Sequence, residues 1–166
     1  YTLGFCYIAP RWHCGEPLEY NWITREKSED FARLVDYRDS YQAGARRFDM
    51  GERSHFHLMP MAEAAMCQIS EWGVESIAAT LLEKTREIAE RGTPLGLTAL
   101  DESKRAGHYL GLRFEKTPPA DLAKQLSERN VFISMRGDAM RVTPHLYNTA
   151  GDVDRLFEVL QDIDVG

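Results

Sequence analysis

Arg141 is the side chain whose position in this sequence best suits chemistry, because a short strand is predicted to end there. A hydrophobic strand over Val131–Met135 is followed by the polar turn Arg136-Gly137-Asp138, and a second short strand then ends at Arg141. An arginine at a strand end can present a planar fork of donors to a carboxylate. The simpler alternative is a surface arginine that caps the turn or pairs with Asp138.

The residues after Arg141 predict a break and then a helix. Pro144 ends the strand, because proline cannot donate to the ladder of hydrogen bonds. Thr149, with Asp152 three residues later, is typical of a helix N-cap with an acidic first turn. A closing helix is therefore expected from Ala150 to about Asp162.

Other patterns that support catalysis or metal binding are missing or incomplete. The sequence contains no G-x-S-x-G, H-E-x-x-H, P-loop or Rossmann glycine pattern. His55 and His57 lie two apart, but they precede a predicted helix and no cysteine or carboxylate set completes a site, so no metal is expected. Five lysines in polar helical or loop contexts are interpreted as solvated surface residues: Lys27, Lys84, Lys104, Lys116 and Lys124.

Composition describes an ordinary globular chain and excludes several classes of partner. The 166 residues are 43% hydrophobic and 28% charged, which is enough to build a core. Lys+Arg number 20 and Asp+Glu 26, a net charge of −6, so nucleic acid is not expected as a partner. No apolar run is long enough to span a membrane. The odd set Cys6, Cys14 and Cys67 predicts reduced thiols and a cytoplasmic location.

The first 72 residues are expected to be poor in regular structure until a helix near their end. Leu3–Ala9 is predicted as a strand that Pro10 ends. Residues 11–50 read as loop, with one short helical stretch near 28–35, and so long an irregular segment is expected to pack on a neighbouring domain or subunit. A helix follows over 56–72. Four methionines are expected to fill a core: Met50, Met59, Met61 and Met66.

Residues 73–166 predict a small α+β domain. A helix over 74–90 is followed by strands over 95–97 and 108–114 and by a helix that starts at Thr117-Pro118-Pro119 and ends near Arg129. With the two strands and the final helix around Arg141, these elements make a three- or four-stranded antiparallel sheet with helices on one face.

The C-terminal sequence VFISMRGDAMRVTPHLYNTAGDVDRLFEVL resembles the end of the class V aminotransferases, which are PLP-dependent enzymes of fold type I. The family pattern is an R-G turn, then R-[VIA]-[ST]-x-x-x-Y-N-[ST] and a D-[VI]-D-x-L helix, matched by Arg141, Thr143, Tyr147, Asn148, Asp152 and Asp154. Through RRFDMGERS and the first residues the resemblance covers nearly the whole chain. It implies that residues 1–72 are the end of the large PLP-binding domain and residues 73–166 the small domain.

The resemblance also implies roles for individual residues. Arg141 takes the place of the arginine that binds the substrate α-carboxylate. Gly4-Phe5 matches the strand that follows the lysine carrying PLP, so the Schiff-base lysine is expected before Tyr1. No catalytic residue is then expected in this chain, which alone should be inactive without the missing N-terminal large domain.

A second implied site lies at the dimer interface, where a Gly-Thr pair of the family reaches the cofactor phosphate of the other subunit. Here Gly51 is followed by Glu52, and a carboxylate repels a phosphate unless it points away or pairs with an arginine. Ser54, His55 or the backbone of Gly51 could replace the threonine.

The resemblance implies a homodimeric PLP-dependent aminotransferase acting on an amino acid. A kynureninase-like lyase, an epimerase, one half of a split enzyme, and a non-catalytic binding or dimerisation module remain alternatives. Cysteine desulfurases carry a catalytic cysteine shortly before the arginine. Since the nearest cysteine to Arg141 is Cys67, persulfide chemistry is not expected.

Overall fold

A computed structural model describes residues 3–163 of the chain, which divides into two compact units. The N-terminal unit is Tyr1–Cys67 and the C-terminal unit is Gln68–Gly166, and helix α1 (Met59–Trp72) crosses the boundary between them. The domain boundary at residues 72 and 73 inferred from the sequence stays a prediction. In the described residues, no helix is long and apolar enough to cross a membrane.

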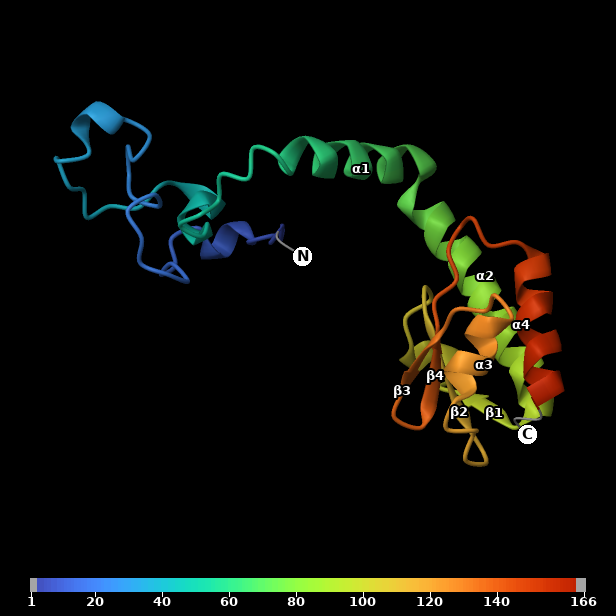
Figure 1. Cartoon of the computed structure of the whole chain (residues 1–166). Coiled ribbons are helices and arrows are strands. Elements are labelled where there is room, and N and C mark those ends of the chain that lie inside the picture. The colour runs from blue at the N-terminus through green and yellow to red at the C-terminus, as the bar shows by residue number, and fades with distance from the viewer. Residues whose placement is uncertain (1–2, 164–166) are drawn as a thin grey trace. The chain divides into compact units, whose positions relative to one another are not determined.

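The C-terminal unit is built on a four-stranded antiparallel sheet in the order β1-β2-β4-β3 (Figure 1). The strands are β1 (Leu97–Ala99), β2 (Leu110–Phe114), β3 (Ser134–Arg136) and β4 (Ala139–Val142). All four strands were expected, although β1, β2 and β3 begin two or three residues later than the sequence indicated. The register sets Arg141 of β4 between Gly111 of β2 and Ser134 of β3.

Three helices cover one face of this sheet, as the sequence predicted: α2 (Val74–Gly92), α3 (Leu122–Glu128) and α4 (Ala150–Ile163). Alternate residues of β2 are buried and exposed, because successive side chains of a strand point to opposite faces. The buried ones pack with apolar residues of the helices in a single core. Its fully buried members include Ile88, Leu97, Leu110, Leu112, Leu122, Leu126, Met140 and Leu160.

Local sequence explains where these elements turn and end. Gly137 opens the two-residue loop between β3 and β4 with φ of 61°, a backbone conformation that glycine adopts without steric cost. Asn130, also at φ 61°, ends α3, and the N–H of Val131 donates to the carbonyl of Leu126 at 2.9 Å. At Gly92, an added Cβ would meet the Leu97 Cβ at 3.2 Å, so glycine lets the end of α2 approach β1 closely.

Helix α4 begins with the cap that the sequence predicted. The backbone N–H of Thr149 donates to Asp152 Oδ2 at 2.7 Å, and the Thr149 hydroxyl donates to the same oxygen at 3.1 Å. In return, the backbone N–H of Asp152 lies 3.4 Å from Thr149 Oγ1. This reciprocal arrangement satisfies donors that would otherwise lack a partner at the start of the helix.

The cap is expected to make stability depend on pH in the acid range. The hydrogen bonds from the backbone N–H and hydroxyl of Thr149 lower the pKa of Asp152 below its ordinary value. A folded-state pKa below the unfolded value of about 3.9 stabilises the fold above that pH, and the contribution is lost as pH falls through the folded pKa. The melting temperature of Asp152→Asn should therefore lie below that of the unchanged protein at neutral pH, and the gap should close by about pH 2. A gap that stays constant on acidification would contradict this role.

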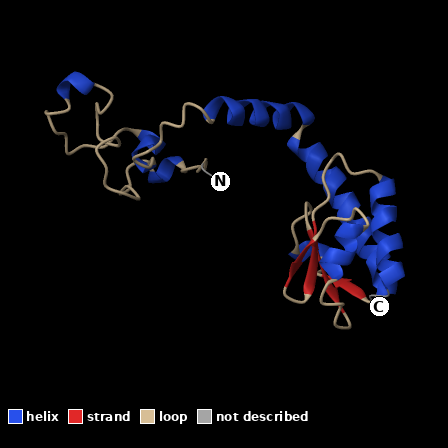
Figure 2. Ribbon diagram, viewed as in Figure 1, coloured by secondary structure: helices blue, strands red, loops and turns tan. Residues whose placement is uncertain are grey.

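The N-terminal unit consists of loops and single 3-10 turns before α1 (Figure 2). The turns lie at Pro10–Trp12, Phe31–Arg33 and Gly44–Phe48, and one isolated bridge joins Arg25 to Tyr41. The irregular character expected for residues 11–50 is confirmed, and the short helix near 28–35 is a 3-10 turn of three residues.

Two expectations for the N-terminal unit are wrong. Residues 3–9 form no strand, because a strand needs hydrogen-bonding partners and the described residues provide none for this segment. The methionines do not fill a core: Met50, Met59, Met61 and Met66 are 41–61% exposed, and no residue of α1 is buried. Large apolar side chains that are at least half exposed are frequent in this unit: Phe5, Tyr7, Trp12, Leu18, Tyr20, Trp22, Phe31, Val35, Tyr37 and Phe56.

Candidate functional site: an unpaired arginine on the open face of the sheet

Arg141 lies on the face of the sheet that the helices leave uncovered. Its neighbours on β4, Met140 and Val142, are buried in the core, so strand alternation turns Arg141 outward, where it is exposed. The residues opposite it, Gly111 on β2 and Ser134 on β3, are small. A Cβ added at Gly111 would have no atom within 4 Å, so the space beside Arg141 is open.

The guanidinium of Arg141 has no hydrogen-bond or ion-pair partner among residues 3–163. The partner that the simpler interpretation offered, Asp138, instead binds Arg113, with Oδ2 at 3.2 Å from Nε. Arg141 is therefore an arginine whose five donors are free to bind a ligand.

A shallow hollow of about 580 Å³ lies over this part of the sheet. It is named the Arg141 hollow here, and its lining contains no carboxylate, although the chain as a whole carries a net charge of −6. Two arginines and a histidine lie in it beside a tyrosine and a threonine. The lining residues are His108, Tyr109, Gly111, Arg136, Ala139, Met140, Arg141 and Thr143. Such a lining favours an anionic ligand.

The segment that follows Arg141 is anchored to α2 and α4. Lys84 Nζ donates to the carbonyl of Asn148 at 2.7 Å, and the Asn148 side chain accepts the backbone N–H of His145 at 2.8 Å. Further along, Asp154 of α4 forms an ion pair with Arg91 of α2 at 2.7 Å. These contacts give physical roles to residues that the family pattern singled out: Asn148 ties the segment after Arg141 to α2, and Asp154 ties α4 to α2.

The residues expected at the cofactor phosphate belong to the N-terminal unit. The backbone N–H of Gly51 donates to a carboxylate oxygen of Glu19, which also accepts from Asn21 Nδ2 at 2.8 Å. Glu52 and Ser54 are exposed, and the side chain of Glu52 has no partner among residues 3–163. The N–H of Gly51 thus already binds an anionic oxygen, and a phosphate would have to replace the Glu19 carboxylate there.

The five lysines lie at the surface. Lys84 is half-buried and bound to Asn148, Lys124 pairs with Glu128 at 3.8 Å, and the other three are exposed. A lysine that carries PLP needs a buried pocket that excludes water. None of these five lysines is buried.

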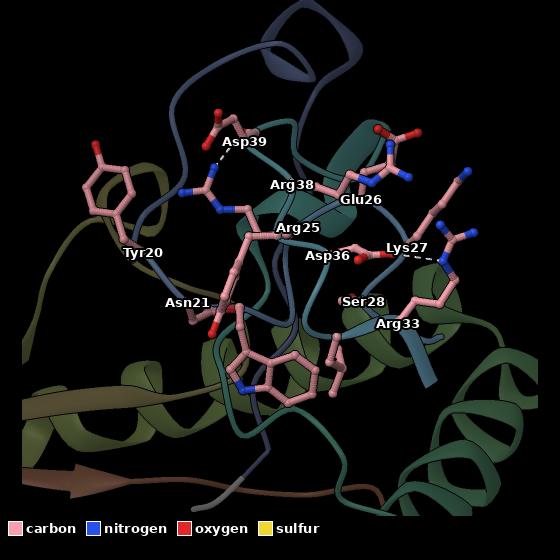
Figure 3. A pocket seen from close by; sticks show the side chains of 13 residues that line it. Tyr20, Asn21, Arg25, Glu26, Lys27, Ser28, Arg33, Asp36, Arg38 and Asp39 are labelled. Carbon is pink, nitrogen blue, oxygen red and sulfur yellow. Dashed lines mark hydrogen bonds and ion pairs between the residues drawn. The ribbon is translucent and has the colours of Figure 1, made fainter. Parts of the chain in front are cut away.

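A second hollow, of about 430 Å³, lies within the N-terminal unit (Figure 3). Two of its arginines have partners: Arg33 Nε donates to Asp36 at 3.0 Å, and Arg25 Nη1 donates to the backbone carbonyl of Asp39 at 2.5 Å. Since acidic and basic side chains alternate around it, this hollow shows no preference for one charge.

The two histidines that precede α1 contact each other through their rings. The rings of His55 and His57 lie edge to face with centroids 6.4 Å apart. Within residues 3–163, no three histidine, cysteine or acidic side chains converge as metal ligands do.

The fold matches several solved structures. A cysteine desulfurase from Thermococcus onnurineus superposes on 95% of this chain with a TM-score of 0.71 at 18% identity. The chain has the same fold as part of this cysteine desulfurase. A mutant of C-DES, with glycine covalently linked to the PLP cofactor, superposes on 76% of the chain with a TM-score of 0.59 at 13% identity. A NifS-like protein superposes on 74% with a TM-score of 0.52 at 22% identity.

The chain spans 42%, 34% and 36% of the lengths of those three structures, in the same order. No protein-family model matches the sequence, and no curated protein shows significant similarity to it. The expected α+β class, with a small antiparallel sheet and helices on one face, is confirmed. That residues 1–72 are the tail of a large domain stays a prediction.

Sequence reasoning identified Arg141 and missed the residues around it. Residues 108–114 were expected only as a strand, and Arg136 was assigned to a turn. Strand alternation could have put Gly111 on the outer face, but only the pairing of β2, β3 and β4 brings these residues beside Arg141.

Proposed function

We propose that this chain is the C-terminal part of a PLP-dependent class V aminotransferase and that it provides the site for the carboxylate of an amino-acid substrate. The observation that carries the proposal is Arg141, exposed and without a partner among residues 3–163, in a hollow whose lining has no carboxylate. The guanidinium would bind the substrate α-carboxylate through two parallel hydrogen bonds.

PLP, when bound, acts as the electron sink for reactions at the substrate Cα. The residues of this chain would orient the substrate, since a carboxylate fixed by a planar fork leaves the amino acid little freedom to rotate. Gly111 and Ser134 leave room beside the fork, and Tyr109 and Thr143 add polar groups to the wall of the hollow. None of the five lysines is surrounded as the PLP-bearing lysine must be, so that lysine is proposed to lie outside this sequence.

The N-terminal unit is proposed to form contacts with the rest of the enzyme, including its dimer partner. Exposed aromatic and aliphatic side chains are concentrated there, and patches of that kind are typical of protein interfaces. The backbone N–H of Gly51 donates to the carboxylate of Glu19, so this N–H is able to bind an anionic oxygen. Contact of Gly51, Glu52 or Ser54 with a partner's cofactor phosphate remains a prediction.

We prefer transamination to persulfide chemistry because none of the chain's cysteines lies near the β3–β4 hairpin in sequence. The hairpin between β3 and β4 is a two-residue loop, Gly137-Asp138, with no room for a cysteine-bearing segment. The three cysteines of the sequence all lie in the N-terminal unit, where they are exposed.

The proposal predicts that the intact protein holds PLP on a lysine outside this sequence. Borohydride reduction of the natively purified protein, followed by peptide mass mapping, should give a pyridoxyl-lysine on a peptide that these 166 residues do not contain. A pyridoxyl mark on Lys84 or another of the five lysines would overturn the placement of the lysine. A protein that carries no mark at all after incubation with PLP would instead be a binding or dimerisation module.

A further inference from the structure

Arg141 shares its hollow with a second arginine, Arg136. The register of β3 and β4 pairs Ser134 with Arg141 and Arg136 with Ala139, so the two arginines are diagonal neighbours on adjacent strands. Met135, between Ser134 and Arg136, packs against the core, which turns Arg136 to the same outer face as Arg141. Diagonal neighbours of this kind have Cα atoms about 7–8 Å apart, so their long side chains can reach one ligand.

Neither arginine is neutralised by an acidic side chain in residues 3–163. The guanidinium of Arg136 donates only to the carbonyl of Met135, at 3.0 Å. The nearby Asp138 is bound to Arg113, which does not line the hollow. Two like charges placed side by side repel each other unless an anion lies between them or beside each one.

We propose that the Arg141 hollow takes an amino acid whose side chain ends in a second anionic group. Arg141 binds the α-carboxylate, and Arg136 binds the distal anion from the neighbouring strand. The inference rests on the proposed function, since it assigns the substrate class of the same site. It explains why an acidic chain keeps two uncompensated arginines on one patch of an open sheet.

Calorimetric titration of the intact protein with succinate and with butyrate tests the assignment, because the two ligands have the same carbon chain and differ by one carboxylate. The protein should bind succinate about tenfold more tightly than butyrate, as expected for one added charge-assisted pair at an exposed site. Arg136→Ala should remove this preference and leave the affinity for butyrate within about twofold. Arg136→Lys should keep part of the preference, since it retains the charge but not the fork.

Lys104→Ala is the control, because it removes one exposed positive charge of the same unit outside the hollow and leaves the Arg113–Asp138 ion pair intact. It should change the preference for succinate by less than about twofold. Equal affinities for the two ligands in the unchanged protein, or an equal loss of both in Arg136→Ala, would overturn the assignment of Arg136. The carboxylate site itself is judged separately: if Arg141→Ala leaves butyrate binding unchanged, the proposed function fails whatever Arg136 does.

Discussion

Replacing Arg141 with alanine is expected to weaken carboxylate binding by the intact protein about 10- to 100-fold. Hydrogen bonds to charged groups contribute about 1.5–3 kcal/mol, and the exposure of this site places the loss toward the lower end. Arg141→Lys should restore little of the affinity, because a point charge does not reproduce two parallel hydrogen bonds. Butyrate titration measures the loss directly, and in an active enzyme the KM for the amino acid should rise while PLP stays bound.

Stability should be nearly unaffected by the same substitution. The Arg141 side chain is exposed and has no partner in residues 3–163, so its removal breaks no contact within the described fold. The melting temperature of Arg141→Ala should therefore match that of the unchanged protein. An Arg141→Ala variant with normal melting and normal carboxylate affinity would remove Arg141 from the site.

Replacing Leu112 with alanine is expected to destabilise the C-terminal unit by about 2–5 kcal/mol. Leu112 has no exposed surface and lies on β2, next to Gly111 but pointing into the core. It is paired with the buried Met140 of β4, and a Cβ added at Gly92 of α2 would lie 3.7 Å from Leu112 Cδ2. Truncation would leave a cavity between the sheet and α2 that close packing cannot fill.

Chemical denaturation of the intact protein, followed by near-ultraviolet circular dichroism and by a probe in the C-terminal unit, measures this effect. Thr98→Ala, on the exposed face of β1, is the control and should change the free energy of unfolding by no more than about 0.5 kcal/mol. Below the unfolding transition, Leu112→Ala should still bind butyrate, because the outer face of β2 keeps its backbone. A loss of affinity in the folded variant would mean that core packing sets the position of Arg141.

The two units differ in how they bury apolar surface. The C-terminal unit encloses a core shared by four strands and three helices, and the hollow on its open face mixes arginines with Tyr109 and Ala139. The N-terminal unit exposes most of its large side chains and buries polar ones instead, among them Thr24, Ser28 and Gln42. Gln42 Nε2 donates to Ser28 Oγ and to the carbonyl of Ile23, both at 2.9 Å, so this unit is organised by hydrogen bonds rather than by a core.

The sequence by itself determined most of the C-terminal unit. Several of its features depend on only a few neighbouring residues and can therefore be predicted from local spacing. They are the alternation over 110–114, the apolar stripes of the helices, the glycine of the β3–β4 turn and the cap at Thr149 and Asp152. Arg141 was placed correctly at the end of a strand for the same reason. In the N-terminal unit, the same local rules predicted a strand at 3–9 that the structure does not contain, because strand formation depends on partners that local sequence does not specify.

Only the tertiary structure decided what surrounds Arg141. Asp138 was the nearest carboxylate along the chain, yet it binds Arg113, since the pairing of β2 with β4 brings Arg113 opposite Ala139, beside the turn that holds Asp138. The pairing of β3 with β4 puts Arg136 on the diagonal from Arg141. These contacts join residues that are 5 to 26 positions apart in sequence. Their selection depends on strand register and on which face the helices cover, and neither is determined by local spacing.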